Sequence, residues 1–204
     1  MAQPTKDRDL VRLYWPPDLR PAFDALFAIE DAMAEVMAGA SQPALAAIKL
    51  AWWREALEKL DSQSAPAEPR LRAAAGEVLP RGVKGVELGR LEEGWAALLS
   101  EQPDPQAVLE RGAVLFGLGA RLLGGDESPG LAAAGRLYVA SQLLRRGRSP
   151  AGLDVPSHFP KMPRALRPLT GLAALARRDL GATIEPEATP GRAWTLLRHR
   201  LTGR

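Results

Sequence analysis

Two carboxylates, Asp31 and Glu35, are the side chains whose type and spacing come nearest to metal chemistry in this sequence. Residues four apart in a helix lie one turn apart on the same face, and Mg²⁺ is bound through carboxylate oxygens. The same spacing is also common on the solvated face of an amphipathic helix. Spacing alone therefore favours a solvated acidic stripe, with a Mg²⁺ site as the alternative.

A cluster of arginines ends another predicted helix, in the segment Gln142-Leu-Leu-Arg-Arg146. Cations near a helix C-terminus are stabilised by the helix dipole, which is sufficient to explain Arg145 and Arg146. Arginine also forms bidentate hydrogen bonds with phosphate and carboxylate groups. Binding of a phosphate or of an acidic partner is therefore the second interpretation of this cluster.

The adjacent pair Trp52-Trp53 is a rarer feature. Neighbouring residues point about 100° apart around a helix, so the two indoles cannot enter the same seam between helices. We expect one of them to enter the core and the other to pack against the wall of a groove or a partner. Burial of both in a thick bundle is the simpler interpretation.

The composition excludes several other kinds of site. The 204 residues include no cysteine and only two histidines, His158 and His199. Disulfides and thiolate metal sites are therefore excluded, and only two residues could serve as the histidine of a catalytic triad. Glycine-rich phosphate loops that follow a strand are absent, and so is a Walker lysine.

Positive charge is concentrated in the last third of the chain. Residues 136–204 contain 13 Lys and Arg against 4 Asp and Glu, although the whole chain carries a net charge of only +3. A solvated arginine-rich surface explains this, and an anionic partner such as a lipid surface is the alternative. Nucleic acid is not expected, because aromatic residues are sparse there. Without an apolar signal region or membrane span, we expect a cytoplasmic protein, at most peripheral at the inner face of the membrane.

The elements that must position these residues are helical. Alanine and leucine dominate and isoleucine occurs three times, which predicts an all-α bundle of about eight helices in a single domain, 1–204. Residues 1–7 are expected to form a loose N-terminus and the proline-rich segment 148–163 an irregular connection. Proline and glycine bound the predicted helices, which cover 7–14, 18–37 with Asp18 as N-cap, 43–60, 70–79, 84–100, 104–123, 129–147, 164–180 and 190–201.

Four segments, in this order, resemble the squalene/phytoene synthase family of all-α isoprenoid synthases. They are Tyr14–Ala28, Ile48–Leu57, Gly135–Arg145, and the pair Pro163–Leu169 and Ala176–Leu180. The second is similar to the "R-x-x-W-W-R-x-A-L" segment of one branch, with Lys49 in place of arginine. That branch includes relatives of a mitochondrial factor that assists the assembly of respiratory complex I. The likeness spans about residues 8–204, although the chain is shorter than the catalytic members.

The resemblance implies two aspartate motifs on facing helices, which hold Mg²⁺ against prenyl diphosphates in the catalytic members. In the first motif, "D-D-x-x-D", the matching residues are Ala34, Glu35 and Ala38, and only Glu35 is a carboxylate. The arginine before that motif falls on Asp31. In the second motif, "N-x-L-R-D", the final aspartate is replaced by Arg146. A cation at a metal-ligand position repels the metal, so the sequence predicts the fold without the family's chemistry.

Three hypotheses follow. In the first, the chain is a non-catalytic protein that binds a lipid, a prenyl chain or a protein partner at the membrane, with no cofactor. In the second, it is a prenyltransferase with altered ligands, in which Asp31 and Glu35 hold Mg²⁺ on one side and Arg145 and Arg146 bind the diphosphate directly. The third is a helical adaptor without a groove. The resemblance makes Arg20, Arg145 and Arg146 candidates for binding diphosphate or another anion, and the candidates for packing a groove or partner are Trp52, Trp53, Phe27 and Tyr138.

Overall fold

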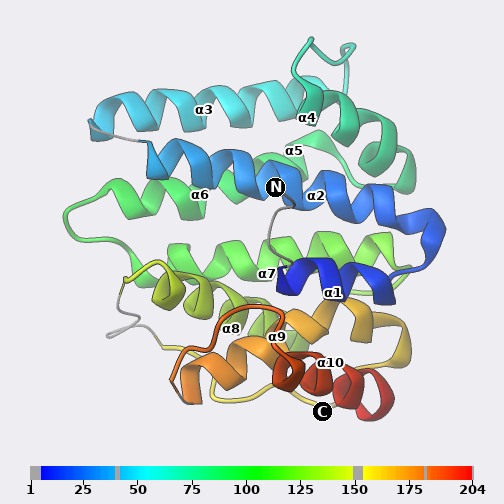
Figure 1. Ribbon diagram of the computed structural model, residues 1–204. Coiled ribbons are helices and arrows are strands. Elements are labelled where there is room, and N and C mark those ends of the chain that lie inside the picture. Colours follow the sequence, from blue (N-terminus) through cyan, green and yellow to red (C-terminus); the bar gives the residue numbers. More distant parts are fainter. Residues whose placement is uncertain (1–5, 40–41, 149–153, 182, 204) are drawn as a thin grey trace, which may run out of the picture.

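The computed structural model describes residues 6–39, 42–148, 154–181 and 183–203. Within these ranges the chain forms helices and irregular connections and no strand (Figure 1). The prediction of an all-α helical bundle is confirmed. Within these ranges, proline stands in the first turn of seven α-helices, where its missing N–H costs no hydrogen bond. These residues are Pro21, Pro43, Pro69, Pro105, Pro129, Pro168 and Pro190.

The α-helices are α1 (Asp7–Tyr14), α2 (Arg20–Ala38), α3 (Pro43–Lys59), α4 (Pro69–Ala73), α5 (Gly85–Gly89), α6 (Leu91–Ala96), α7 (Pro105–Leu122), α8 (Pro129–Arg145), α9 (Arg167–Gly181) and α10 (Pro190–Thr202). Single turns of 3₁₀ helix cover Pro17–Leu19, Leu79–Arg81, Ala97–Leu99 and Arg164–Leu166, and Ala74–Val78 is a π-helical turn. Most predicted boundaries agree with these bounds within two residues.

Two local predictions were wrong. Asp18 is not an N-cap, because it lies in a 3₁₀ turn and Leu19 occupies the cap position of α2. The single helix expected over 84–100 is broken at Arg90. The carboxylate of Asp61 accepts hydrogen bonds from the N–H groups of Gly85 and Val86, which fixes the start of α5 against the end of α3. The short helix α5 therefore packs against α3, and α6 begins at Leu91, one residue after Arg90 interrupts the helix.

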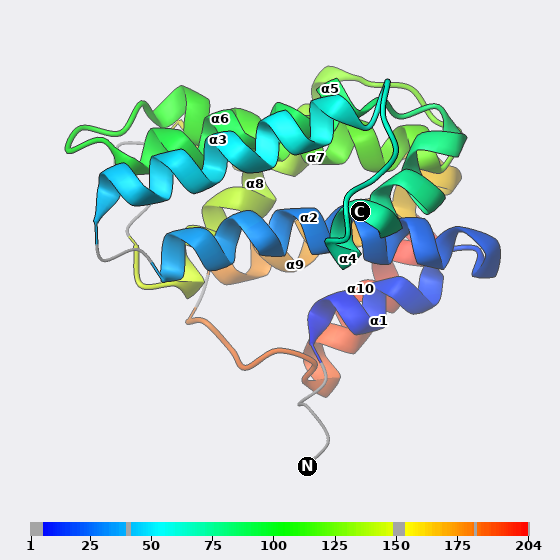
Figure 2. The ribbon, with the colours of Figure 1, turned by 90° about the horizontal axis from the view of Figure 1, so that it is seen from above.

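The helices pack in layers (Figures 1 and 2). Helix α7 lies between α6 and α8, α8 also contacts α9, and α10 packs on α9 and α1. Helices α7 and α8 approach most closely where Gly112 faces Gly135, since a Cβ on either residue would overlap the carbonyl oxygen of the other. This glycine contact sets the distance between α7 and α8, and α8 contributes residues to the polar pocket described below.

The buried apolar side chains form one cluster that runs through α1 to α9 and reaches α10 at Leu196. Trp15 and Trp95 are among its largest members. The N-terminus was predicted to be loose through residue 7. Residues 1–5 lie outside the described ranges, but for Asp7 the prediction was wrong, because Asp7 is buried and hydrogen-bonded to Arg192 at the other end of the chain.

The proline-rich connection contains no helix at 148 and 154–163, as expected, and 149–153 lie outside the described residues. Phe159 and Met162 of this segment are buried. In the described part of the chain, no helix is both long enough and apolar enough to cross a bilayer.

Candidate functional site

A polar pocket of about 210 Å³ lies between α1, α2, α8, α9 and α10. It brings together the two regions that sequence analysis singled out, because Asp31 of α2 and the segment Gln142–Arg146 of α8 both contribute to its wall. The charged side chains that line it are Lys6, Asp7, Arg8, Asp31, Arg145, Arg146, Asp179, Glu187 and Arg192. Five are cations and four are carboxylates, so the lining is close to neutral with a slight positive excess.

A network of buried ion pairs forms one wall of the pocket. The Nε and Nη2 atoms of Arg145 donate to the two carboxylate oxygens of Asp179, each at 2.8 Å. Asp179 also accepts from Ser141 and from Arg192, and Nε of Arg192 lies 2.9 Å from both carboxylate oxygens of Asp7. The guanidinium of Arg145 further donates to the carbonyl oxygen of Glu185. These arginines are therefore held by structural partners.

The network favours the ionised form of Asp179. Burial by itself raises the pKa of a carboxylate. Here the hydrogen bonds from Arg192, Arg145 and Ser141 outweigh burial and hold the pKa of Asp179 below its ordinary value. Asp7, Asp179 and Arg192 were not among the site residues predicted from the sequence. The available signal was an aspartate in an otherwise basic segment, Arg177-Arg-Asp-Leu, which needs a cationic partner if it is buried.

The two candidate metal ligands, Asp31 and Glu35, do not converge on one point. Nη2 of Arg8 donates to both carboxylate oxygens of Asp31, at 2.7 and 2.8 Å. Nη2 of Arg70, at the start of α4, donates to both oxygens of Glu35. Glu35 does not line the polar pocket, and among the described residues no group of three or more His, Asp or Glu side chains is placed to hold a metal ion.

The three candidate anion-binding arginines lie in different environments. Arg145 is held by Asp179, as described above. Arg20 lines a separate hollow and donates to the carbonyl oxygens of Leu13 and Trp15 at the end of α1. Arg146 lines the polar pocket, and its guanidinium lies 5.1 Å from the ring centroid of Trp95. No carboxylate among the described residues forms an ion pair with Arg146.

A buried charged cluster that was not predicted from the sequence lies among α2, α6 and α7. Arg111 is fully buried, its Nη1 lies 3.1 Å from a carboxylate oxygen of Glu30, and its guanidinium stacks 3.5 Å from the ring centroid of Trp95. Nε1 of Trp95 donates to the other oxygen of Glu30. Burial lowers the pKa of Arg111, and the carboxylate of Glu30 opposes this effect. One indole therefore contacts two cations, Arg111 and Arg146.

Tyr138, one of the candidate groove residues, lies on α8. It lines the pocket, and burial raises the pKa of its hydroxyl to about 12. Its ring packs against Phe27 and Phe116 at centroid distances of 6.4 and 5.7 Å. The side chains of Phe27 and Tyr138 are both buried, and of these two groove candidates only Tyr138 lines the polar pocket.

The tryptophan pair divides as the 100° argument predicts. Trp53 is buried, whereas Trp52 is 48% exposed on the outer face of α3 and meets Trp53 edge to face. Neither tryptophan lines the polar pocket. The interpretation in which both indoles are buried was therefore wrong.

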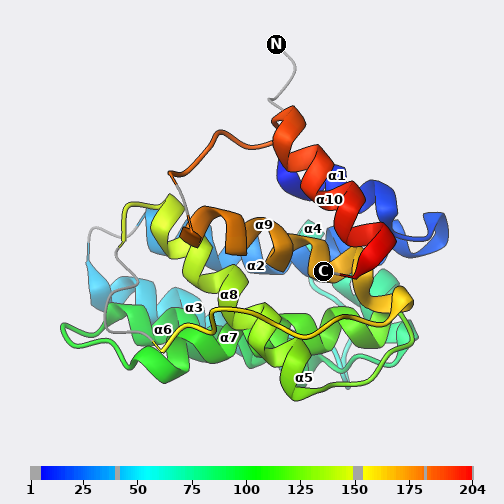
Figure 3. The same ribbon diagram turned by 90° about the horizontal axis from the view of Figure 1, so that it is seen from below.

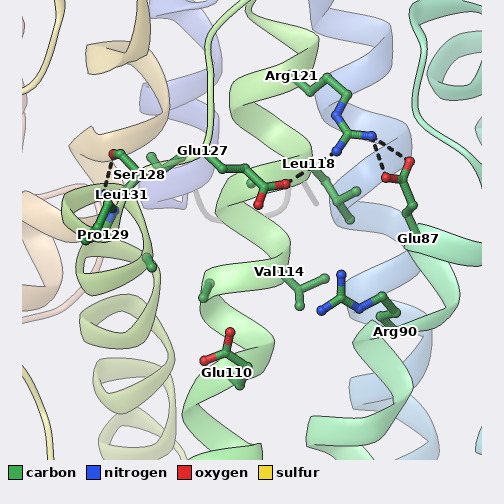
Figure 4. A pocket seen from close by; sticks show the side chains of 13 residues that line it. Glu87, Arg90, Glu110, Val114, Leu118, Arg121, Glu127, Ser128, Pro129 and Leu131 are labelled. Atoms are coloured by element: carbon green, nitrogen blue, oxygen red, sulfur yellow. Dashed lines mark hydrogen bonds and ion pairs between the residues drawn. The ribbon is translucent and has the colours of Figure 1, made fainter.

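A larger groove of about 340 Å³ lies between α5, α7 and the start of α8 (Figure 4). Its floor is apolar and includes Val114 and Leu118. On its rim, Arg121 joins Glu87 at 2.6 Å and Glu127 at 3.3 Å. None of the residues predicted from the sequence to form a site lines this groove, so the polar pocket is the stronger candidate.

The chain was compared with models of protein families, with curated proteins and with solved structures, and none of them matches it.

Proposed function

We propose that the protein is a non-catalytic helical bundle, similar to the squalene/phytoene synthases, that binds a lipid or a protein partner at a membrane surface. One observation carries the proposal. The charged groups that metal-dependent prenyl transfer would need are already used as structural links, since Asp31 is paired with Arg8, Glu35 with Arg70 and Arg145 with Asp179.

The arrangement of the pocket supports the resemblance itself. In the catalytic members the two metal motifs lie on facing helices. Here Asp31, which precedes the residues matching the first motif, lines one pocket with Gln142, Arg145 and Arg146 of the second, whereas Glu35 lies outside this pocket. The chemistry differs, because the first region presents a carboxylate that an arginine already neutralises and the second presents Arg146. A divalent cation in this pocket would have to displace Arg8 from Asp31 and would face the positive charge of Arg146.

A second candidate function rests on Arg146. This guanidinium lines the pocket without a carboxylate partner among the described residues, and arginine binds diphosphate without a metal. A prenyl diphosphate could therefore bind independently of Mg²⁺. Arg145→Ala is a poor test of this candidate, because Arg145 holds Asp179 in the fold. Arg146→Gln is the sharper variant.

Calorimetric titration with farnesyl and geranylgeranyl diphosphate, with and without Mg²⁺, tests both candidates. The proposal expects no Mg²⁺-dependent binding and no condensation product. Binding that is indifferent to Mg²⁺ and is lost in Arg146→Gln would favour the second candidate. Mg²⁺-dependent binding, or formation of a head-to-head product, would overturn the proposal. Lys49→Gln is the matched control, because Lys49 is an exposed cation on α3 that does not line the polar pocket.

A further inference from the structure

The outward face of α10 is apolar. Trp194, Leu197 and Leu201 are 66%, 39% and 69% exposed. Their spacing of three and four residues places them on one side of the helix. The opposite side is held in the protein by Arg192, Leu196 and His199, which are buried. The three exposed side chains therefore form a continuous stripe that the fold itself does not cover.

The charges on α10 have one sign. The helix contains Arg192, Arg198 and Arg200 and no acidic residue. Arg192 is buried, whereas Arg198 and Arg200 are exposed. At 100° per residue, Arg198 lies on one flank of the apolar stripe and Arg200 on the other. Arg200 is held in place, because it donates to the carbonyl oxygen of Tyr14 and its guanidinium lies 5.3 Å from the Tyr14 ring centroid.

The position of α10 leaves this stripe accessible. Helix α10 packs on α9 and α1 at the edge of the bundle, and in Figure 3 it lies in front of α1 at the surface. Leu13, near the end of α1, is a further exposed apolar side chain, and it shares a surface hollow with Arg200. The surface at this end of the molecule thus combines apolar side chains with cations.

We propose that the outward face of α10 docks on an anionic lipid bilayer. In this arrangement Trp194, Leu197 and Leu201 enter the boundary between headgroups and acyl chains, and Arg198 and Arg200 contact the anionic headgroups. An amphipathic helix with Trp and Leu on one side and flanking cations has the composition of helices that lie in the membrane interface. This inference rests on the membrane location in the proposed function and names the surface responsible for it.

Charge complementarity favours lipid over a second copy of the chain. A symmetric contact through α10 would bring Arg198 and Arg200 of one copy close to the same cations of the other, with no carboxylate on either helix to balance them. Anionic headgroups supply that balance, at a gain of about fivefold in affinity for each arginine near the surface. The stripe is also convex, so its side chains can enter a bilayer without a complementary groove.

Co-sedimentation of the full chain with lipid vesicles tests the inference. We expect binding to vesicles of phosphatidylserine and phosphatidylcholine, weak binding to phosphatidylcholine alone, and release at high salt. The double variant Trp194→Ser/Leu201→Ser should lose at least about tenfold in binding, and Arg198→Gln about fivefold. Ile48→Ser is the matched control, since Ile48 is 67% exposed on α3, away from α10, and should leave vesicle binding unchanged.

Several results would overturn the inference. They are equal binding to both kinds of vesicle, unchanged binding of the double variant, self-association that the double variant abolishes, or binding to polyglutamate without binding to the vesicles. The proposed function fails in a different way. Mg²⁺-dependent binding of a prenyl diphosphate would remove the non-catalytic interpretation and leave the α10 surface standing. Absent vesicle binding would remove the α10 surface and the membrane location that it explains, and would leave the non-catalytic interpretation standing.

Discussion

Arg145 of α8 and Asp179 of α9 form a bidentate ion pair, with two N–H···O distances of 2.8 Å, at the wall of the polar pocket. The sequence offers Arg145 as a ligand-binding residue at the end of a helix. In the structure its guanidinium is occupied by Asp179 and by the carbonyl oxygen of Glu185. The pair fixes α8 against α9, and through Arg192 it also fixes α10 and α1.

Asp179→Asn is expected to lower the free energy of unfolding by about 3–5 kcal/mol, because it leaves the buried Arg192 and the partly buried Arg145 short of a counter-charge. Urea denaturation followed by tryptophan fluorescence measures this loss. Asp24→Asn is the matched control, since the Asp24–Arg12 pair is exposed and should cost less than about 1 kcal/mol. Similar losses in the two variants would show that the buried network contributes no more to stability than an exposed ion pair does.

The same aspartate predicts a pH dependence. The pKa of Asp179 is lower in the folded protein than its ordinary value, so the unfolded chain binds the proton more readily. Its contribution to stability is therefore present above a pH of about 4 and is lost as the pH falls further. The difference in unfolding free energy between the wild type and Asp179→Asn should narrow below that pH. Urea titrations between about pH 7 and pH 3 measure it, and a constant difference would contradict the assignment.

The helices could be predicted from the sequence because their signals are local. Pro105 begins α7 and Pro129 begins α8, as expected from a residue without an N–H at a helix start. The division of Trp52 and Trp53 between surface and core follows from the 100° angle between adjacent helical residues. Each of these inferences needs only residues within one helix.

The partners in the site could not be predicted, because they are distant along the chain. Asp31 and Glu35 bond with arginines that lie 23 and 35 positions away. Helical spacing shows that the two carboxylates share a face, but it does not show which helix packs against that face. For the same reason Arg111 resembles a surface residue in the sequence, although its packing against Trp95 and Glu30 buries it.

The buried pair of Glu30 and Arg111 predicts strong coupling between two variants. Glu30→Gln keeps an acceptor for Nε1 of Trp95 but leaves Arg111 without a counter-charge, so it should cost about 3–5 kcal/mol. In Glu30→Gln/Arg111→Met the buried charge is gone, and the double variant should be closer to the wild type than Glu30→Gln. Thermal and urea unfolding of Glu30→Gln, Arg111→Met and the double variant measures the coupling energy between the two residues. Additive losses would contradict the coupling.

The contact between Gly112 and Gly135 makes a prediction about the spacing of α7 and α8. Gly135→Ala should destabilise the protein by about 1–3 kcal/mol or more, because the new methyl group would overlap the carbonyl oxygen of Gly112, and backbone cannot move aside as a flexible side chain can. Gly76→Ala is the control, since a Cβ there meets nothing within 4 Å. That variant should be neutral or stabilised by up to about 1 kcal/mol, because alanine restricts the unfolded chain. Urea denaturation of both variants measures the change in unfolding free energy. Equal changes would show that the packing of α7 and α8 does not depend on this close approach.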